Sequence, residues 1–79
     1  MKPIGKILHD LLRESPYTTR VVAELIGTTT GSMSNVFTGK SELSVDLALK
    51  FEKVFGEGKA SEWLHYQVDY LLWTVQNEE

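Results

Sequence analysis

The chain has no cysteine, only two prolines and no long run of apolar residues. Without cysteine it can form no disulfide and offers no thiolate to a metal ion, which is typical of a reducing compartment. No stretch is apolar over the roughly 20 residues that a membrane-spanning helix needs, and Met1–Gly5 shows no signal-peptide pattern. We therefore expect a cytoplasmic protein that does not enter a membrane.

Patterns of catalytic chemistry are missing as well. The two histidines, His9 and His65, lie on different predicted segments and lack the paired spacing of metal ligands. No serine sits in a nucleophile elbow, and the glycines do not form a phosphate-binding loop of the usual pattern. A chain of 79 residues also buries too little surface to shield a reaction from water easily. We expect neither an enzyme nor a bound cofactor or metal.

The sequence does contain enough apolar surface for one small folded domain. Hydrophobic residues make up 42% and aromatic residues 10% of the chain, which is typical of a globular protein rather than a disordered one. This length predicts a single domain over residues 1–79. A domain of this size buries little more than about 60% of the surface of its unfolded chain, so its stability is limited and association with a partner would increase it.

The charges are distributed unevenly. The net charge is −3, which taken alone argues against a nucleic-acid ligand. Residues 1–41, however, carry five cations and three anions, a balance of +2, whereas residues 42–79 carry three cations and eight anions, a balance of −5. Because the distribution matters more than the sum, we expect any phosphate-facing surface in the first half. Such asymmetry also arises by chance in small proteins, so it is only a hint about partners.

Apolar residues recur at helical spacing along five segments, which predicts an all-α fold. The segments run from about residue 4 to 15, 18 to 26, 30 to 37, 44 to 55 and 60 to 75. Pro16 ends the first segment and Gly27 ends the second. Caps are expected at Thr18, at Thr28 or Thr29, and at Ser44. The positions expected to face the core are Ile4, Ile7, Leu8, Leu11, Leu12, Val21, Val22, Leu25, Ile26, Met33, Val36, Phe37, Leu47, Ala48, Phe51, Val54 and Phe55.

The most informative stretch is residues 18 to 40, where two short predicted helices are joined by a turn that contains Gly27. This is the layout of a helix-turn-helix over residues 18–37, in which the second helix enters the DNA major groove. Gly27 supplies a backbone angle that a Cβ would resist, and the small Ala23 lets the helices cross closely. The outward positions of the second helix are short and uncharged, and most can hydrogen-bond to base edges. They are Thr30, Gly31, Ser32, Ser34 and Asn35.

Other residues of this stretch lie at helix starts or turns, where DNA phosphates would run. Free backbone N–H groups at a helix N-terminus favour a nearby phosphate. Hydroxyl and lysine side chains can add further contacts to the same phosphates. The residues expected to contact phosphates are Thr18, Thr19, Thr29, Ser34, Thr38 and Lys40.

Residues Thr18–Thr29 and Ser32–Lys40 together resemble the lambda-repressor-like (XRE) family of helix-turn-helix proteins. The flanking residues narrow the resemblance to the HigA-type plasmid-maintenance antidotes, the antitoxin half of a toxin–antitoxin pair. Pro3–Leu8 (PIGKIL) is similar to the PGEIL opening of these antidotes, and Leu43–Leu49 is similar to their IS…ALRL segment. Ser61–Trp73 is similar to their EFWLNLQ…YDLW ending.

The resemblance implies a five-helix lambda-repressor-like DNA-binding domain. Its base-reading positions would be Thr30, Gly31, Ser32 and Asn35, and it assigns phosphate contacts to four of the six residues above. Family members often carry Arg or Gln where Thr30, Gly31 and Asn35 stand. Direct base contacts would then be few, and phosphates and DNA shape would carry more of the affinity. The alternative is a retained scaffold with little DNA binding.

The last predicted helix has two apolar faces at about 100° per residue. Its aliphatic face consists of Leu64, Val68, Leu71, Leu72 and Val75. Its aromatic face, on nearly the opposite side, consists of Trp63, Tyr66, Tyr70 and Trp73. A domain of this size cannot easily bury both, and exposed Tyr and Trp are typical of protein interfaces. We expect the aromatic face to form a dimer or partner interface. The alternative is that Trp63 and Tyr66 complete the core against the first and fourth segments.

The leading hypothesis is a transcriptional repressor of the antitoxin type that binds double-stranded operator DNA as a homodimer. The family resemblance further implies a cognate toxin protein as a partner. An orphan or phage-type repressor would carry the same residues, and a toxin reading frame beside the gene would separate these two. A different class of function is a protein-interaction module that binds little DNA. Salt-dependent DNA binding would distinguish it from a repressor.

Overall fold

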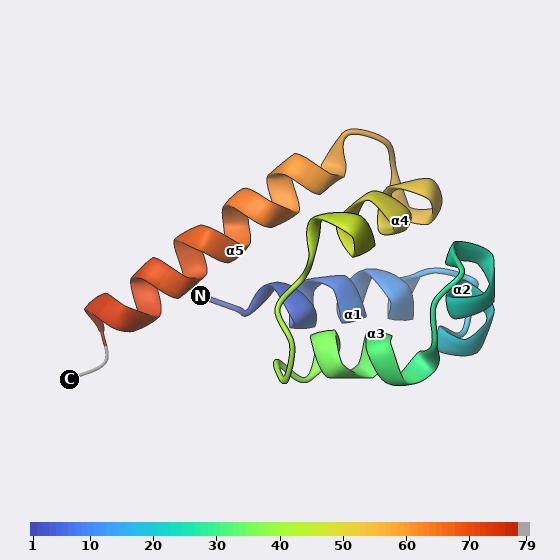
Figure 1. Cartoon of the computed structure of the whole chain (residues 1–79), viewed down its shortest axis with the longest axis horizontal. Coiled ribbons are helices and arrows are strands. Elements are labelled where there is room, and N and C mark those ends of the chain that lie inside the picture. Colours follow the sequence, from blue (N-terminus) through green and yellow to red (C-terminus); the bar gives the residue numbers. More distant parts are fainter. Residues whose placement is uncertain (78–79) are drawn as a thin grey trace.

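The computed structural model describes residues 1–77, which form five α-helices and no strand (Figure 1). The prediction of an all-α fold is therefore confirmed. The helices are α1 (Ile4–Glu14), α2 (Thr19–Ile26), α3 (Thr30–Phe37), α4 (Val45–Phe55) and α5 (Lys59–Gln76). Their ends fall within one residue of the predicted segments. Over this part of the chain, no helix has the length and apolar character needed to cross a bilayer.

The starts of α2, α3 and α4 are capped by side chains that the sequence predicts. Thr18, Thr29 and Ser44 each accept a hydrogen bond from the backbone N–H three residues further on, at 3.2, 3.0 and 3.1 Å. Each cap satisfies an N–H group that a helix start leaves unpaired and contributes about 1 kcal/mol. At the start of α5, the Ala60 N–H is bound instead by the Glu52 carboxylate of α4, at 2.9 Å. Side chains therefore fix these four helix starts.

Gly27 turns the chain from α2 towards α3. Its φ of 73° and ψ of 36° lie in the left-handed region, which glycine adopts without strain. The next residue, Thr28, donates its N–H to the carbonyl oxygen of Ala23 at 2.9 Å. This bond satisfies one of the last carbonyls of α2, as in a Schellman-type helix end. The predicted helix stop at Gly27 is confirmed.

The core lies where the five helices meet. α1 packs against α3 and α5, α2 packs against α3 and α4, and α4 packs against α5. Phe51 of α4 is fully buried between Phe37 of α3 and Trp63 of α5, with ring centroids 6.4 Å away in both cases. The buried apolar residues are Ile4, Leu8, Leu12, Val22, Ala23, Ile26, Met33, Val36, Leu43, Leu47, Ala48, Phe51, Ala60 and Trp63.

Two of the predicted core positions on α2 are wrong. Val21 and Leu25 are 41% and 59% exposed, whereas Ala23 is buried. α2 has only eight residues and meets α3 and α4 along a single side. Its apolar residues extend further round the helix than those two neighbours cover.

α1 approaches α3 so closely at Gly5 that no side chain would fit there. A Cβ on the buried Gly5 would overlap the carbonyl oxygen of Val36 and lie 3.1 Å from the Cα of Phe37. Gly5 does not have a positive φ, so glycine is required here for space rather than for its backbone angle. One turn further along α1, the ring of His9 stacks on Phe37 with centroids 4.7 Å apart. These contacts hold one side of α3 against α1.

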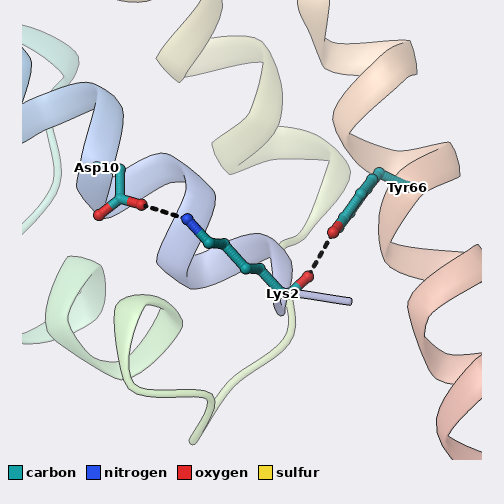
Figure 2. Close-up of polar contacts among 3 residues, drawn as sticks. All are labelled: Lys2, Asp10 and Tyr66. Carbon is teal, nitrogen blue, oxygen red and sulfur yellow. Dashed lines mark hydrogen bonds and ion pairs between the residues drawn. The ribbon is translucent and has the colours of Figure 1, made fainter.

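The N-terminal residues are tied to both α5 and α1 (Figure 2). The hydroxyl of Tyr66 donates to the backbone carbonyl of Lys2 at 2.7 Å. The Lys2 ammonium lies 3.4 Å from the Asp10 carboxylate in an exposed ion pair. α5 passes the start of α1, and its second half continues beyond the other helices (Figure 1). The molecule is therefore elongated, with extents of 40 × 24 × 21 Å.

Candidate nucleic-acid interface

α2 and α3 form a rigid pair joined through the turn at Gly27. Val22 and Ile26 of α2 and Met33 and Val36 of α3 are all at most 6% exposed. Because protein interiors are close-packed, these side chains fix the angle between the two helices. The same burial determines which side of α3 faces the solvent.

The outer side of α3 is uncharged and accessible. In Figure 1, α3 lies at the edge of the molecule, with no helix outside it. Its exposed residues are Thr30, Gly31, Ser32, Ser34 and Asn35. The four residues predicted to read bases therefore share one open surface. Their contact with DNA stays a prediction.

Internal hydrogen bonds already orient part of this surface. The Thr29 hydroxyl accepts from the Ser32 N–H and donates to the Ser32 hydroxyl oxygen, both at 3.0 Å. The Thr38 hydroxyl donates to the carbonyl oxygen of Ser34 at 2.9 Å. Over the described part of the chain, by contrast, the Asn35 amide forms no hydrogen bond, which leaves its donors and its acceptor available to a ligand. Asn35 is thus the residue of α3 best suited to pair with adenine through two hydrogen bonds.

The residues predicted to contact phosphates surround α3 along the chain. Thr18 and Thr19 lie at the start of α2, Thr29 caps α3, and Thr38 and Lys40 follow its end. Thr19 is half-buried, and the other four are exposed. The first turns of α2 and α3 contain no acidic residue, whereas those of α4 and α5 each contain one. A phosphate at the start of α2 or α3 would meet the positive end of the helix dipole without an opposing carboxylate in that turn.

Lys40 lies in the connection between α3 and α4, and this connection is fixed at both ends. The Ser41 N–H donates to the carbonyl oxygen of Asn35 at 3.0 Å. Gln67 of α5 pairs with both backbone groups of Leu43: its Oε1 accepts from the N–H at 2.6 Å, and its Nε2 donates to the carbonyl at 3.0 Å. Lys40 is exposed and makes no ion pair among the residues described. Its backbone is thus held close to the end of α3, and its charge is available to a phosphate.

The sequence alone gives no role to Gln67. The only available signal is its register, because Gln67 follows Trp63 by four residues and so shares the inward side of the last helix. A polar residue at such a position needs partners. The backbone of Leu43 provides them.

The aromatic face of α5 turns inward at its start, so the predicted interface is wrong at Trp63, whereas for Tyr70 and Trp73 it stays a prediction. Trp63 is only 5% exposed and meets Phe51 edge-on. Tyr66 is half-buried against the core, Tyr70 is half-buried, and Trp73 is 39% exposed. α4 and the start of α1 both need apolar cover, and large rings supply it better than the smaller aliphatic side chains. The alternative, in which Trp63 and Tyr66 complete the core, agrees with the structure.

No cluster of metal-ligating side chains forms anywhere within residues 1–77. His9 is engaged in stacking on Phe37, and His65 is exposed on α5. No protein-family model matches the chain, and no curated protein matches it either. A functional proposal therefore depends on the geometry around α3 and on the motifs of the sequence.

Proposed function

We propose that the chain is a lambda-repressor-like transcriptional repressor that acts in the cytoplasm and binds operator DNA through α3. The observation that carries the proposal is the open, uncharged side of α3, held in place by the buried Met33 and Val36 on the other side. A helix presented in this way fits the major groove of B-DNA, which is about 12 Å wide. Its short side chains allow the backbone to come close to the base edges.

Within this proposal, Asn35 makes the main base contact. The hydroxyls of Thr30 and Ser32 add weaker contacts, and Gly31 permits close approach without adding one. With so few direct contacts, sequence-dependent DNA shape supplies part of the specificity. Recognition would therefore tolerate changes at base pairs that Asn35 does not reach.

Phosphate contacts orient the protein on the duplex. They come from the starts of α2 and α3, from the exposed hydroxyls of Thr18, Thr29, Ser34 and Thr38, and from Lys40. Half-buried Thr19 contributes mainly through its backbone. The positive balance of residues 1–41 supports this placement, because the negative charge of the molecule is concentrated in residues 42–79. The acidic part would face away from the DNA.

The resemblance to plasmid-maintenance antidotes extends the proposal to a cognate toxin protein. A reading frame for a small toxin next to the gene, whose product co-purifies with the chain, would support it. Absence of such a reading frame would favour the orphan or phage-type repressor. The DNA-binding proposal does not depend on this outcome.

The proposal is tested by titrating DNA from the chain's own upstream region at several salt concentrations. Affinity should fall steeply with salt, with a slope of about −0.9 in log Kobs against log salt per phosphate contacted. Lys40→Ala should weaken binding to all sequences and reduce that slope by about 1. Asn35→Ala should instead reduce discrimination at one base pair, by about 1–3 kcal/mol.

Lys53→Ala is the matched control, because Lys53 is an exposed lysine on α4 and lies outside the proposed surface. It should leave the affinity and the salt slope unchanged. Equal effects of the Lys40 and Lys53 variants would mean that the binding is non-specific attraction. No effect of either the Lys40 or the Asn35 change would show that α3 does not contact the DNA.

A further inference from the structure

A small groove lies between α5, the start of α1, and the end of α3 with the connection that follows it. Its volume is about 90 Å³, and it is half-open to solvent and lined mainly by apolar atoms. Since a single water needs about 10–15 Å³ of such space, the groove has room for roughly six to nine non-hydrogen atoms. A drug-sized ligand needs at least about 300 Å³, so this groove suits a single ring or a short chain. The apolar side chains that line it include Ile4, Val36, Tyr70 and Leu71.

Contacts between different elements hold the walls of this groove in place. The Tyr66 hydroxyl joins α5 to the backbone carbonyl of Lys2, just before α1 (Figure 2). The next residue of α5, Gln67, binds both backbone groups of Leu43 in the connection between α3 and α4. On the remaining side, α1 meets the backbone of α3 at Gly5. The groove is therefore formed before any ligand binds, as small-molecule sites in proteins usually are.

Glu42 is the only charged residue that lines the groove, and Lys40, two residues earlier, does not line it. Glu42 is exposed and forms no ion pair within residues 1–77. A cation in the groove would therefore meet an available carboxylate, whereas an anion would be repelled. Tyr70 adds an aromatic wall, which favours apolar rings as well as cations. A ligand with an apolar ring and a cationic end matches this distribution.

We propose that this groove binds a small aromatic amine, with its ring among Ile4, Tyr70 and Leu71 and its ammonium group beside Glu42. The available space limits the ligand to one ring with a short chain. The ring replaces water against apolar side chains, which supplies most of the affinity. The ion pair with Glu42 adds selectivity for amines over neutral molecules of the same shape. This ligand site goes beyond the proposed DNA binding and does not depend on it.

Titration with benzylamine, followed by backbone amide shifts in NMR without DNA, tests the site. Benzylamine consists of one ring and an ammonium group that is charged at neutral pH. We expect saturable shifts at Ile4, Gly39 and Tyr70, with a dissociation constant of about 1 mM for a ligand of this size. Benzyl alcohol has the same shape without the charge and should bind about two- to fivefold more weakly, the contribution of an exposed ion pair. Equal binding of the two molecules would overturn the recognition of an amine.

One pair of variants tests the carboxylate. Glu42→Gln should weaken benzylamine binding by about two- to fivefold and leave benzyl alcohol binding unchanged, because only the amine uses the charge. Glu57→Gln is the matched control, because Glu57 is also an exposed carboxylate and lies outside the groove. It should change neither affinity. Equal effects of the two changes would mean that the amine responds only to the net charge of the molecule.

A second pair of variants tests the apolar wall. Leu71→Gln should weaken both ligands by about fourfold, the effect of roughly one buried CH₂ group. Leu72→Gln is the matched control, because Leu72 is the next residue of α5, lies outside the groove and has similar exposure, 56% against 41%. Circular dichroism checks that all variants are folded. Equal effects at Leu71 and Leu72, or no saturable shift among the lining residues, would overturn the site.

Discussion

Gly5 and Gly31 are both helical glycines, yet their surroundings are opposite. Gly5 is buried, and a Cβ there would overlap the backbone of α3. Gly31 is exposed on α3, and the nearest atom to an added Cβ is the Thr29 hydroxyl oxygen at 3.9 Å. Adding a methyl group should therefore lower the stability of the fold at Gly5 and raise it at Gly31.

We expect Gly5→Ala to lower the free energy of unfolding by about 1–3 kcal/mol or more, because the backbone of α1 or α3 must move to accommodate the methyl group. Gly31→Ala should raise it by up to about 1 kcal/mol, because alanine is the better helix former and has room. Urea unfolding of both variants checks this pair. A Gly5 variant as stable as the wild type would mean that α1 and α3 are not packed as closely as described.

Single-residue features were predictable where their cause is local. The caps Thr18, Thr29 and Ser44 and the stop at Gly27 depend on residues within one helical turn, and all four appear in the structure. The role of Gly5 was not predictable, because the atom that it must avoid belongs to Val36, on a different helix. Sequence spacing contains no information about such an approach.

At the scale of whole elements, the connection between α3 and α4 depends on α5. Both backbone groups of Leu43 are bound by one side chain, Gln67. Leu43 itself is buried. A side chain of α5 therefore fixes the connection that carries Lys40 and follows the exposed side of α3.

Replacing Gln67 should show this coupling. Gln67→Leu keeps the approximate size of the side chain but leaves the part-buried N–H and C=O of Leu43 unpaired, which we expect to cost about 1–3 kcal/mol of stability. If the connection also positions Lys40, the DNA affinity of the Gln67→Leu variant should fall. This fall should be larger than the loss caused by the part of the variant that is unfolded. Thermal unfolding and DNA titration on the same samples measure both effects. Unchanged stability would show that the two hydrogen bonds from Gln67 to Leu43 do not hold this connection.

The helical spacing of apolar residues predicts the helices but not which of their faces is buried. Helical spacing gave the correct helices and correctly separated α5 into an aliphatic and an aromatic face. It could not show which face meets the core, since that depends on the space that Phe51 and the start of α1 leave for Trp63 and Tyr66. The same limit explains Val21 and Leu25, which belong to an apolar side of α2 that no neighbour covers.

At the scale of the whole molecule, two exposed surfaces belong to parts of the chain with opposite charge balance. The exposed, uncharged side of α3 and Lys40 belong to the part of the chain with a balance of +2, and the exposed aliphatic face of α5 belongs to the acidic part. α5 continues beyond the other helices (Figure 1), and the molecule is 40 Å long. In the proposed function, the exposed side of α3 meets the DNA while the aliphatic face of α5 stays accessible.

The most direct test of the account is a map of backbone amide shifts by NMR as DNA from the chain's upstream region is added. If α3 recognises the DNA, the largest changes should fall on Thr30–Asn35 and at the starts of α2 and α3, and added salt should reverse them. Changes confined to α5, with the amides of α3 unmoved at saturating DNA, would contradict it.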